Sequence, residues 1–323
     1  MIDDSAGLYG PDSEAWRLNR EAMLVLGAGP RALLLQVAHP LVAEGVDQHS
    51  DFRADPWRRL QGTLRSYLSI VYGRAPRARA EIRRLNALHR DIGGPVRDAG
   101  ARRRHGARYR ARDPELSLWV HATLVDSTIV ANDRWLGPLP RNRQAAFYAE
   151  TRPIGRAFGI PDSLLPADLG AFERYVADML DPHGPVHPTP AARDIAAAVL
   201  APPLGPIAPT FGWIPARAYA WTLWPSVGLL PASVRAEYGL PWGVRERAVS
   251  AWLVAAWRAW RPILPPDFRQ LPQATTADRR VAGAHRAAWS PAHRVRFDPG
   301  PETTIPRWRA PAPCRSPVQQ RRR

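Results

Sequence analysis

The sequence predicts an all-α protein. Its apolar residues recur every three or four positions over most of the chain, which is the period of a helix with one buried face. Two Asp-Pro pairs, Asp55-Pro56 and Asp113-Pro114, place an N-cap and a first-turn proline where two of these patterns begin. Few segments alternate with the two-residue period of a strand, so we expect little sheet.

Length and composition fit one large folded domain. The chain has 323 residues, of which 45% are hydrophobic and 13 are tryptophan. Helical periodicity ends near residue 270, and the chain beyond is rich in proline and arginine. We therefore expect a helical catalytic domain over residues 1–270 and a disordered basic tail over residues 271–323. The single cysteine, Cys314, lies in that tail and excludes an intrachain disulfide and a thiolate metal cluster.

The net charge of +16 comes entirely from arginine, because all 45 basic residues are Arg. Residues 271–323 hold 11 of these arginines against three carboxylates, which is half of the excess charge. A basic tail of this kind is typical of weak contact with anionic surfaces. No motif that reads nucleic acid accompanies the charge, so we expect no specific nucleic-acid partner.

The first ten residues, MIDDSAGLYG, lack the positive and apolar regions of a secretory signal. The apolar runs are also shorter than the roughly 18 residues that a membrane-spanning helix needs. We therefore expect a cytoplasmic protein, which the basic tail could bring to a membrane as a peripheral protein.

The N-terminal region is expected to hold three short helices. Residues 13–26 carry an amphipathic pattern that the following Gly-Ala-Gly ends. Pro30 begins a second helix that Pro40 ends or kinks, and residues 41–52 predict a short helix followed by a polar turn. The GAGP sequence lacks the third glycine and the preceding strand of a dinucleotide-binding loop, so we exclude that function.

Asp55 begins the next helix, which extends to about Tyr72. Its apolar stripe has spacings of four, four and three residues: Leu60, Leu64, Leu68 and Val71. A neighbouring stripe places a guanidinium, a hydroxyl and a phenol on one face: Arg59, Thr63 and Tyr67. An arginine-rich helix over residues 76–92 and an exposed basic loop or short hairpin over residues 95–112 follow.

The helix that begins at Asp113 is apolar on nearly every face, and such a helix is usually buried on every face. His121 lies in its middle, with Asp126 and Ser127 close behind. A buried imidazole needs a partner for each ring nitrogen, or a metal on one of them. The pattern itself fits both a hydrogen-bonded core histidine and a metal ligand. Further helices are expected at residues 139–157, 166–180, 189–200, 214–224 and 242–261.

Four sequence features together resemble the haem-binding oxygenase family of latex clearing protein (rubber oxygenase) and the fungal MpaB oxygenases. They are Ala-His-Pro at 38–40, Gly-Val-x-x-His-Ser at 45–50, Asp-Pro-x-x-Arg-Leu at 55–60 and Trp-Val-His-Ala-Thr at 119–123. The resemblance covers roughly residues 15–262. It implies an all-α fold around one haem b, with dioxygen as co-substrate.

The resemblance also implies roles for individual residues. His121 would be the proximal iron ligand, and Arg59 and Thr63 would be the catalytic distal pair facing bound dioxygen. Latex clearing protein has a distal lysine three residues after the arginine, and here that position is Gly62. The departure implies a more open distal side or a substrate other than rubber.

The other histidines are assigned from their surroundings. His39 and His49 belong to the matching motifs, and we expect them to form hydrogen bonds that tie residues 31–50 to their neighbours, with a part in the haem pocket as the alternative. His89, near the end of an arginine-rich helix, is a rival axial ligand. His183 and His187 lie in a loop rich in proline and glycine and are expected to be solvated.

These observations lead to one function and two alternatives. We expect a haem-dependent oxygenase that acts on an apolar, isoprenoid-like or polyisoprenoid-like substrate, by oxidative cleavage of a carbon–carbon double bond as in the family. The alternatives are a haem-binding sensor that performs no turnover and a structural helical protein.

Overall fold

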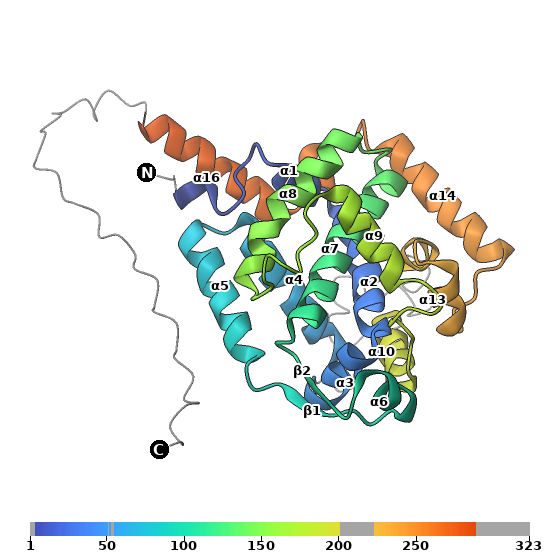
Figure 1. Cartoon of the computed structure of the whole chain (residues 1–323). Helices are drawn as coiled ribbons and strands as arrows, with labels where there is room; N and C mark the ends of the chain where they lie inside the picture. Colours follow the sequence, from blue (N-terminus) through green and yellow to red (C-terminus); the bar gives the residue numbers. More distant parts are fainter. Residues whose placement is uncertain (1–3, 51, 53–54, 201–222, 289–323) are drawn as a thin grey trace, which may run out of the picture. The chain divides into compact units, whose positions relative to one another are not determined.

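Two long helices, α2 (Ala22–Ala38) and α7 (Pro114–Trp135), pack against each other at the centre of the protein (Figure 1). The structure is a computed structural model that describes residues 4–50, 52, 55–200 and 223–288. The remaining helices are η1 Asp4–Ala6, α1 Glu14–Asn19, α3 Pro40–His49, α4 Pro56–Tyr72, α5 Ala75–Leu88, α6 Ala99–His105, α8 Arg141–Ala157, α9 Leu169–Met179, α10 Pro190–Leu200, α13 Ala232–Glu237, α14 Val244–Trp260, α15 Pro266–Arg269 and α16 Pro272–Ala288. The all-α prediction is confirmed.

The chain divides into two units. Met1–Ala284 form a compact unit that holds every feature discussed below, and His285–Arg323 form the second, of which the structure describes only the end of α16. The expected helix at 214–224 and most of the expected basic tail lie outside the described residues.

Helix α7 is buried along most of its length, as its composition predicts. Asp113 caps it by accepting a hydrogen bond from the Glu115 amide at 2.9 Å. Trp119 is 1% exposed and donates its indole N–H to the Leu35 carbonyl of α2 at 3.1 Å. The two helices are also joined by a buried ion pair, in which Arg31 Nη1 lies 2.6 Å from Asp126 Oδ2.

The prediction that Gly-Ala-Gly ends a helix and Pro30 begins another was wrong, because α2 runs through all of these residues. A side chain at Gly27 would overlap the Trp135 indole of α7, so this glycine serves close helix packing. Pro30 cannot donate to the carbonyl four residues before it, and that carbonyl, of Leu26, instead accepts from Ser226 Oγ at 3.4 Å.

The actual break lies between α1 and α2, at Arg20 and Glu21. The Arg20 carbonyl accepts from the Leu271 amide at 2.9 Å, and Glu21 pairs with Gln270 in an isolated antiparallel bridge. The backbone groups that would have joined the two helices are thus bonded to a segment 250 residues away in the chain, which the local sequence does not reveal.

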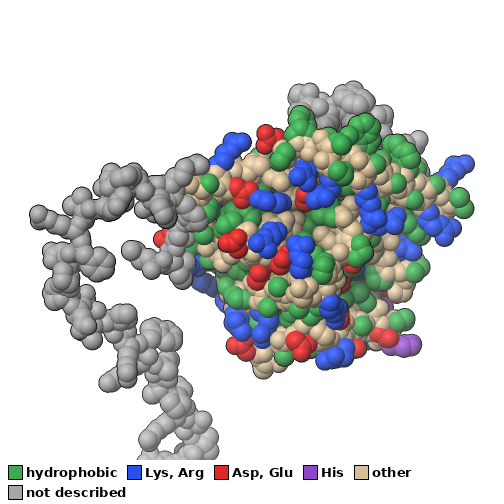
Figure 2. Space-filling model, turned by 90° about the horizontal axis from the view of Figure 1, so that it is seen from above, with side chains coloured by type: hydrophobic (Ala, Val, Ile, Leu, Met, Phe, Trp, Pro, Cys, Tyr) green, Lys and Arg blue, Asp and Glu red, His purple; other side chains and the backbone are tan. Residues whose placement is uncertain are grey.

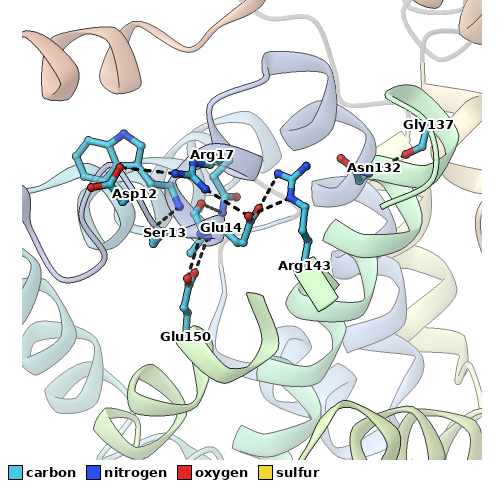
Figure 3. A network of polar contacts seen from close by, with 11 residues as sticks. Asp12, Ser13, Glu14, Arg17, Asn132, Gly137, Arg143 and Glu150 are labelled. Atoms are coloured by element: carbon cyan, nitrogen blue, oxygen red, sulfur yellow. Dashed lines mark hydrogen bonds and ion pairs between the residues drawn. The ribbon is translucent and has the colours of Figure 1, made fainter. Parts of the chain in front are cut away.

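The start of α1 is held by charged side chains of α8 (Figure 3). Both oxygens of the Glu150 carboxylate accept amide hydrogens of α1, from Glu14 at 3.1 Å and Ala15 at 2.9 Å. Arg143 in turn donates to the Glu14 carboxylate at 2.7 and 3.0 Å, which lowers the pKa of Glu14. These contacts satisfy free N–H groups at a helix start where a carboxylate is favoured.

The expectation that helical structure ends near residue 270 was wrong, since α16 begins at Pro272. Its buried face (Ala274, Ala277, Val281) packs in a cluster with Trp16, Leu68 and Val71. Asp278 also accepts the Trp16 indole N–H at 2.9 Å and pairs with Arg20. The buried face of α16 consists mainly of alanine among polar residues, so composition alone does not reveal this helix.

The region between α5 and α7 forms the expected short hairpin, with an unexpected helix inside it. Strands β1 (Gly93–Pro95) and β2 (Arg108–Arg110) pair antiparallel, with Gly94 opposite Tyr109. Helix α6 lies between them and is capped by Asp98, which accepts from the Ala101 amide at 2.7 Å.

Among the described helices, none has both the length and the apolar composition to cross a membrane by itself. Helices α2 and α3 reach that composition only as a pair, and the chain bends by 100° between them. On the face shown in Figure 2, arginine, acidic and apolar side chains are intermingled.

Candidate functional site

The predicted polar face of α4 exists and carries a linked set of side chains. Arg59 Nη1 donates to Thr63 Oγ1 at 2.6 Å, and Arg59 Nε donates to Ser50 Oγ at 3.1 Å. The Thr63 hydroxyl donates to the Arg59 carbonyl at 3.0 Å. Thr63 therefore uses its hydrogen to fix the helix turn and its lone pair to orient the guanidinium. Arg59 keeps N–H groups that have no partner among the described residues.

Arg59 is exposed to solvent on one side, while the protein packed around its guanidinium lowers its pKa by desolvation. It is also close enough to His89 to influence that ring. Burial, and next the positive charges of Arg59 and Arg84, lower the pKa of His89. The rival axial ligand, at the end of α5, is therefore close enough to the candidate distal arginine for the two groups to interact.

His121 has the one feature that sequence reasoning required of a ligand, a buried ring nitrogen without a partner. Its Nε2 is shielded from solvent and makes no hydrogen bond. Burial lowers the pKa of His121 to about 4, so the ring is neutral at pH 7. A neutral nitrogen with a free lone pair in apolar surroundings is the donor that a haem iron takes from a protein.

The surroundings of Nε2 are closed by α8. A methyl group placed at Gly155 would lie 3.5 Å from His121 Nε2 and 3.1 Å from Leu165 Cδ2. Because Nε2 has no accessible surface, a planar cofactor can reach it only if the imidazole turns or α8 moves. The donor chemistry therefore fits haem, and the packing requires a local opening for loading.

The described residues contain no group of three or more His, Cys, Asp or Glu side chains placed to hold a metal ion. A metal bound through His121 would therefore take its other ligands from outside this part of the chain. Haem meets that condition, because its porphyrin supplies four nitrogens and the protein needs to add only one.

Asp126 serves Arg31 and is not a partner of His121. The side chain of Arg31 is only 4% exposed, and it donates to Asp126 at 2.6 Å, to Ser127 at 2.8 Å and to the Leu229 carbonyl at 2.8 Å. The polar residues after His121 on α7 thus build a structural ion pair.

His39 and His49 both lie at the ends of α3 and have local contacts. His39 Nδ1 accepts from the Leu41 amide at 3.2 Å and so caps α3, and its ring lies 5.2 Å from that of His105. The His49 ring lies edge-on to Tyr109, at 6.4 Å between centroids. The local hydrogen bond expected of His39 is confirmed, and the part of either histidine in a haem pocket stays a prediction.

The buried side chain of His39 is expected to make the unfolding free energy sensitive to acid. Burial, and next the neighbouring His105, lower its pKa from 6.5 to about 3. The unfolded chain therefore binds a proton first as pH falls below 6.5, and the folded state loses stability between pH 6.5 and about 3. We expect His39→Asn, whose amide oxygen can still cap α3, to show a shallower fall in unfolding free energy over this range. Urea unfolding at several pH values measures the slope, and equal slopes would contradict the assignment.

The structure distinguishes the two loop histidines and adds two residues to the site. His183 is exposed as expected, but the His187 side chain is only 23% exposed: its Nδ1 lies 3.5 Å from Glu237 Oε2 and its Nε2 is buried. Ser50 and Gly155 were not assigned to the site. Ser50 was visible in the Gly-Val-x-x-His-Ser motif, whereas Gly155 carries no signal in the sequence.

Comparison with known proteins finds one matching family. Residues 16–261 match the family model described as ER-bound oxygenase mpaB/B'/Rubber oxygenase, catalytic domain. The protein belongs to this family. The match spans α1 to the C-terminal end of α14 and includes His121, Arg59 and Thr63. The resemblance drawn from the four motifs is confirmed.

The similar curated proteins have no stated function. An uncharacterised protein of Mycobacterium tuberculosis, Rv2237, and one of Mycobacterium bovis, Mb2261, are each 26% identical to the chain over 244 residues. The alignment covers 72% of this chain and 87% of each relative. No solved structure matches the chain. The family therefore supplies the oxygenase character, and the details rest on this chain's own residues.

Proposed function

We propose that this protein is a haem b-dependent oxygenase that uses dioxygen to oxidise an apolar, isoprenoid-like substrate. The observation that carries the proposal is the buried, neutral and unpartnered Nε2 of His121, in a chain whose matched domain is an oxygenase catalytic domain. When bound, haem supplies an iron centre for dioxygen chemistry, which protein side chains do not provide.

The residues of this chain have distinct roles in the proposal. His121 holds the cofactor through Nε2, and the apolar helix α7 around it excludes water. The free N–H groups of Arg59 would donate hydrogen bonds to an oxygen atom that gains negative charge, an effect that grows when bound substrate excludes water from this exposed side chain. Thr63 and Ser50 orient that guanidinium. His89 lies near Arg59 and adds a second imidazole on the same side.

The proposed reaction is cleavage of a carbon–carbon double bond. One oxygen atom of dioxygen goes to each carbon, which gives two carbonyl groups, so the net reaction needs no external reductant. This part rests on family membership, as does the apolar substrate class. The expectation of a cytoplasmic protein with peripheral contact to a membrane rests on the amino-acid sequence alone.

Oxygen uptake by the haem-loaded protein tests the function. We expect a Soret band after haem is added, and oxygen consumption that depends on an apolar polyene such as squalene in detergent, with carbonyl products. A Soret band without polyene-dependent uptake would favour a non-catalytic haem sensor. Absence of the band would favour a structural protein in which His121 stays packed against α8.

Gly62 offers a test of the distal side that does not depend on turnover. It is exposed on α4, and a Cβ there would meet no atom within 4 Å, so the helix accepts any side chain. We expect Gly62→Lys to raise the unfolding free energy by up to about 1 kcal/mol through helix propensity. In the haem-loaded protein we expect the new amine to shift the absorption spectrum toward a six-coordinate iron.

Gly62→Ala is the matched control, because it gains the same helix propensity without an amine. It should be stabilised and keep the spectrum of the original protein. Identical spectra for the lysine and alanine variants would place Gly62 away from the iron and argue against Arg59 as its distal neighbour.

A further inference from the structure

A second candidate binding site lies away from His121, where α3, α6 and α10 meet (Figure 1). A cavity of about 590 Å³ is lined by Pro40 of α3, by one side of α6 and by residues 187–190 and Arg193 at the start of α10. Cavities of about 300–1,000 Å³ are the usual size of small-molecule sites. None of His121, Arg59 or Thr63 lines it. This cavity is therefore separate from the proposed oxygenase site.

The lining is strongly basic. It includes three arginines (Arg103, Arg104 and Arg193) and a single carboxylate, that of Asp98. Arg103 and Arg104 have no ion pair or hydrogen bond to another described residue, and Arg193 uses only its Nε, which donates to the Glu237 carbonyl at 3.0 Å. The carboxylate of Asp98 is already occupied as the cap of α6. The lining thus keeps two uncompensated positive charges with free guanidinium N–H groups.

The N-terminus of α10 adds to the positive potential. Pro190 is the first residue of α10 and lines the cavity. The start of a helix carries a partial positive charge and free N–H groups. At α10, Thr189 Oγ1 accepts a hydrogen bond from the Ala192 amide at 3.3 Å. The Ala191 amide does not take part in this N-cap hydrogen bond.

An unsatisfied imidazole lies at the same place. His187, which lines the cavity, has Nδ1 3.5 Å from Glu237 Oε2, and its buried Nε2 makes no hydrogen bond. Buried polar atoms in a folded protein nearly always have a partner, so the free Nε2 of His187 fits a polar ligand in the cavity.

We propose that this cavity binds a phosphate monoester group. A dianion neutralises the two excess charges of the lining, and guanidinium forks bind phosphate oxygens through paired N–H donors. When Nε2 of His187 carries a proton, it can donate a hydrogen bond to a phosphate oxygen. The volume admits an organic group beside the phosphate. The source is either a soluble phosphate ester or a lipid headgroup of the same chemistry.

Titration of the full-length protein with phenyl phosphate tests the soluble source, and flotation with phosphatidylcholine vesicles, with and without phosphatidic acid, tests the lipid source. We expect binding to one or both probes. The double variant Arg103→Gln/Arg104→Gln should weaken it about tenfold or more, because it removes two charge-assisted contacts to the phosphate oxygens.

The matched control is Arg102→Gln/Arg108→Gln. It removes the same charge from exposed arginines of α6 and β2 that do not line the cavity, and it should bind like the original protein. Equal loss in both double variants would show that general charge explains the binding, and would overturn the proposal. Absence of binding to both probes in correctly folded original protein, as judged by circular dichroism, would also overturn it. Neither result depends on haem.

Discussion

His121→Ala is expected to abolish stable haem binding. The variant removes the imidazole whose Nε2 is buried, unpartnered and neutral, with a pKa of about 4, so no other group on α7 can replace it. We expect the Soret absorbance after haem titration and desalting to fall at least about tenfold, because loss of a contact that only supports a metal ligand already lowers metal affinity by about 10–100-fold. Absorption spectroscopy of the desalted proteins measures the effect.

Two further measurements distinguish the loss of an iron ligand from damage to the fold. Added imidazole can occupy the space of the missing ring, and it should restore part of the Soret band in His121→Ala. His89→Ala is the matched control, since His89 belongs to the side of Arg59, and it should keep its haem. An unchanged five-coordinate spectrum in His121→Ala would transfer the ligand role to another histidine. If His89→Ala loses the band instead, the axial ligand lies at the end of α5.

Much of the fold could be predicted because the sequence within each helix indicates where the helix begins and which face is buried. Asp55 and Asp113 cap helices where the Asp-Pro pairs place them, and the apolar periods locate α4, α7, α8 and α14 within a few residues. The errors come from long-range contacts. Gly27 was interpreted as a helix end although it makes room for Trp135, and α16 was missed because its small buried residues meet Trp16 from the other end of the chain. Neither partner is visible from local sequence.

The candidate site also combines features that local sequence predicts with features that depend on long-range packing. The spacing of four residues on α4 was enough to predict that Arg59 and Thr63 share a face, because helix geometry fixes that relation. The closure of Nε2 by Gly155 and the position of His89 near Arg59 depend on how α8 and α5 pack, and no spacing encodes either. The basic cavity was hidden for a further reason: in a chain with 45 arginines, single arginines carry little information until a structure shows which of them lack partners.

Asp126→Ala is expected to give the largest loss of stability among single changes on α7 outside the proposed haem site. Arg31 has a side chain only 4% exposed, and Asp126, at 2.6 Å, is the one carboxylate paired with it among the described residues. Removing Asp126 leaves a buried guanidinium without a counter-charge, which typically costs about 3–5 kcal/mol. The bonds from Arg31 to Ser127 and to the Leu229 carbonyl remain but carry no full negative charge. Urea unfolding of the variant measures this loss.

The double variant Arg31→Met/Asp126→Leu separates the charge from the packing. A buried ion pair gains its attraction only after both groups have lost water, so replacing both partners by apolar residues of similar size is often neutral or stabilising. We therefore expect the double variant to be more stable than Asp126→Ala, although it carries one more substitution. The single variants Arg31→Met and Asp126→Leu complete the comparison. If their losses of unfolding free energy added up to the loss in the double variant, Arg31 and Asp126 would be independent. The contact between α2 and α7 would then depend on apolar packing around Trp119.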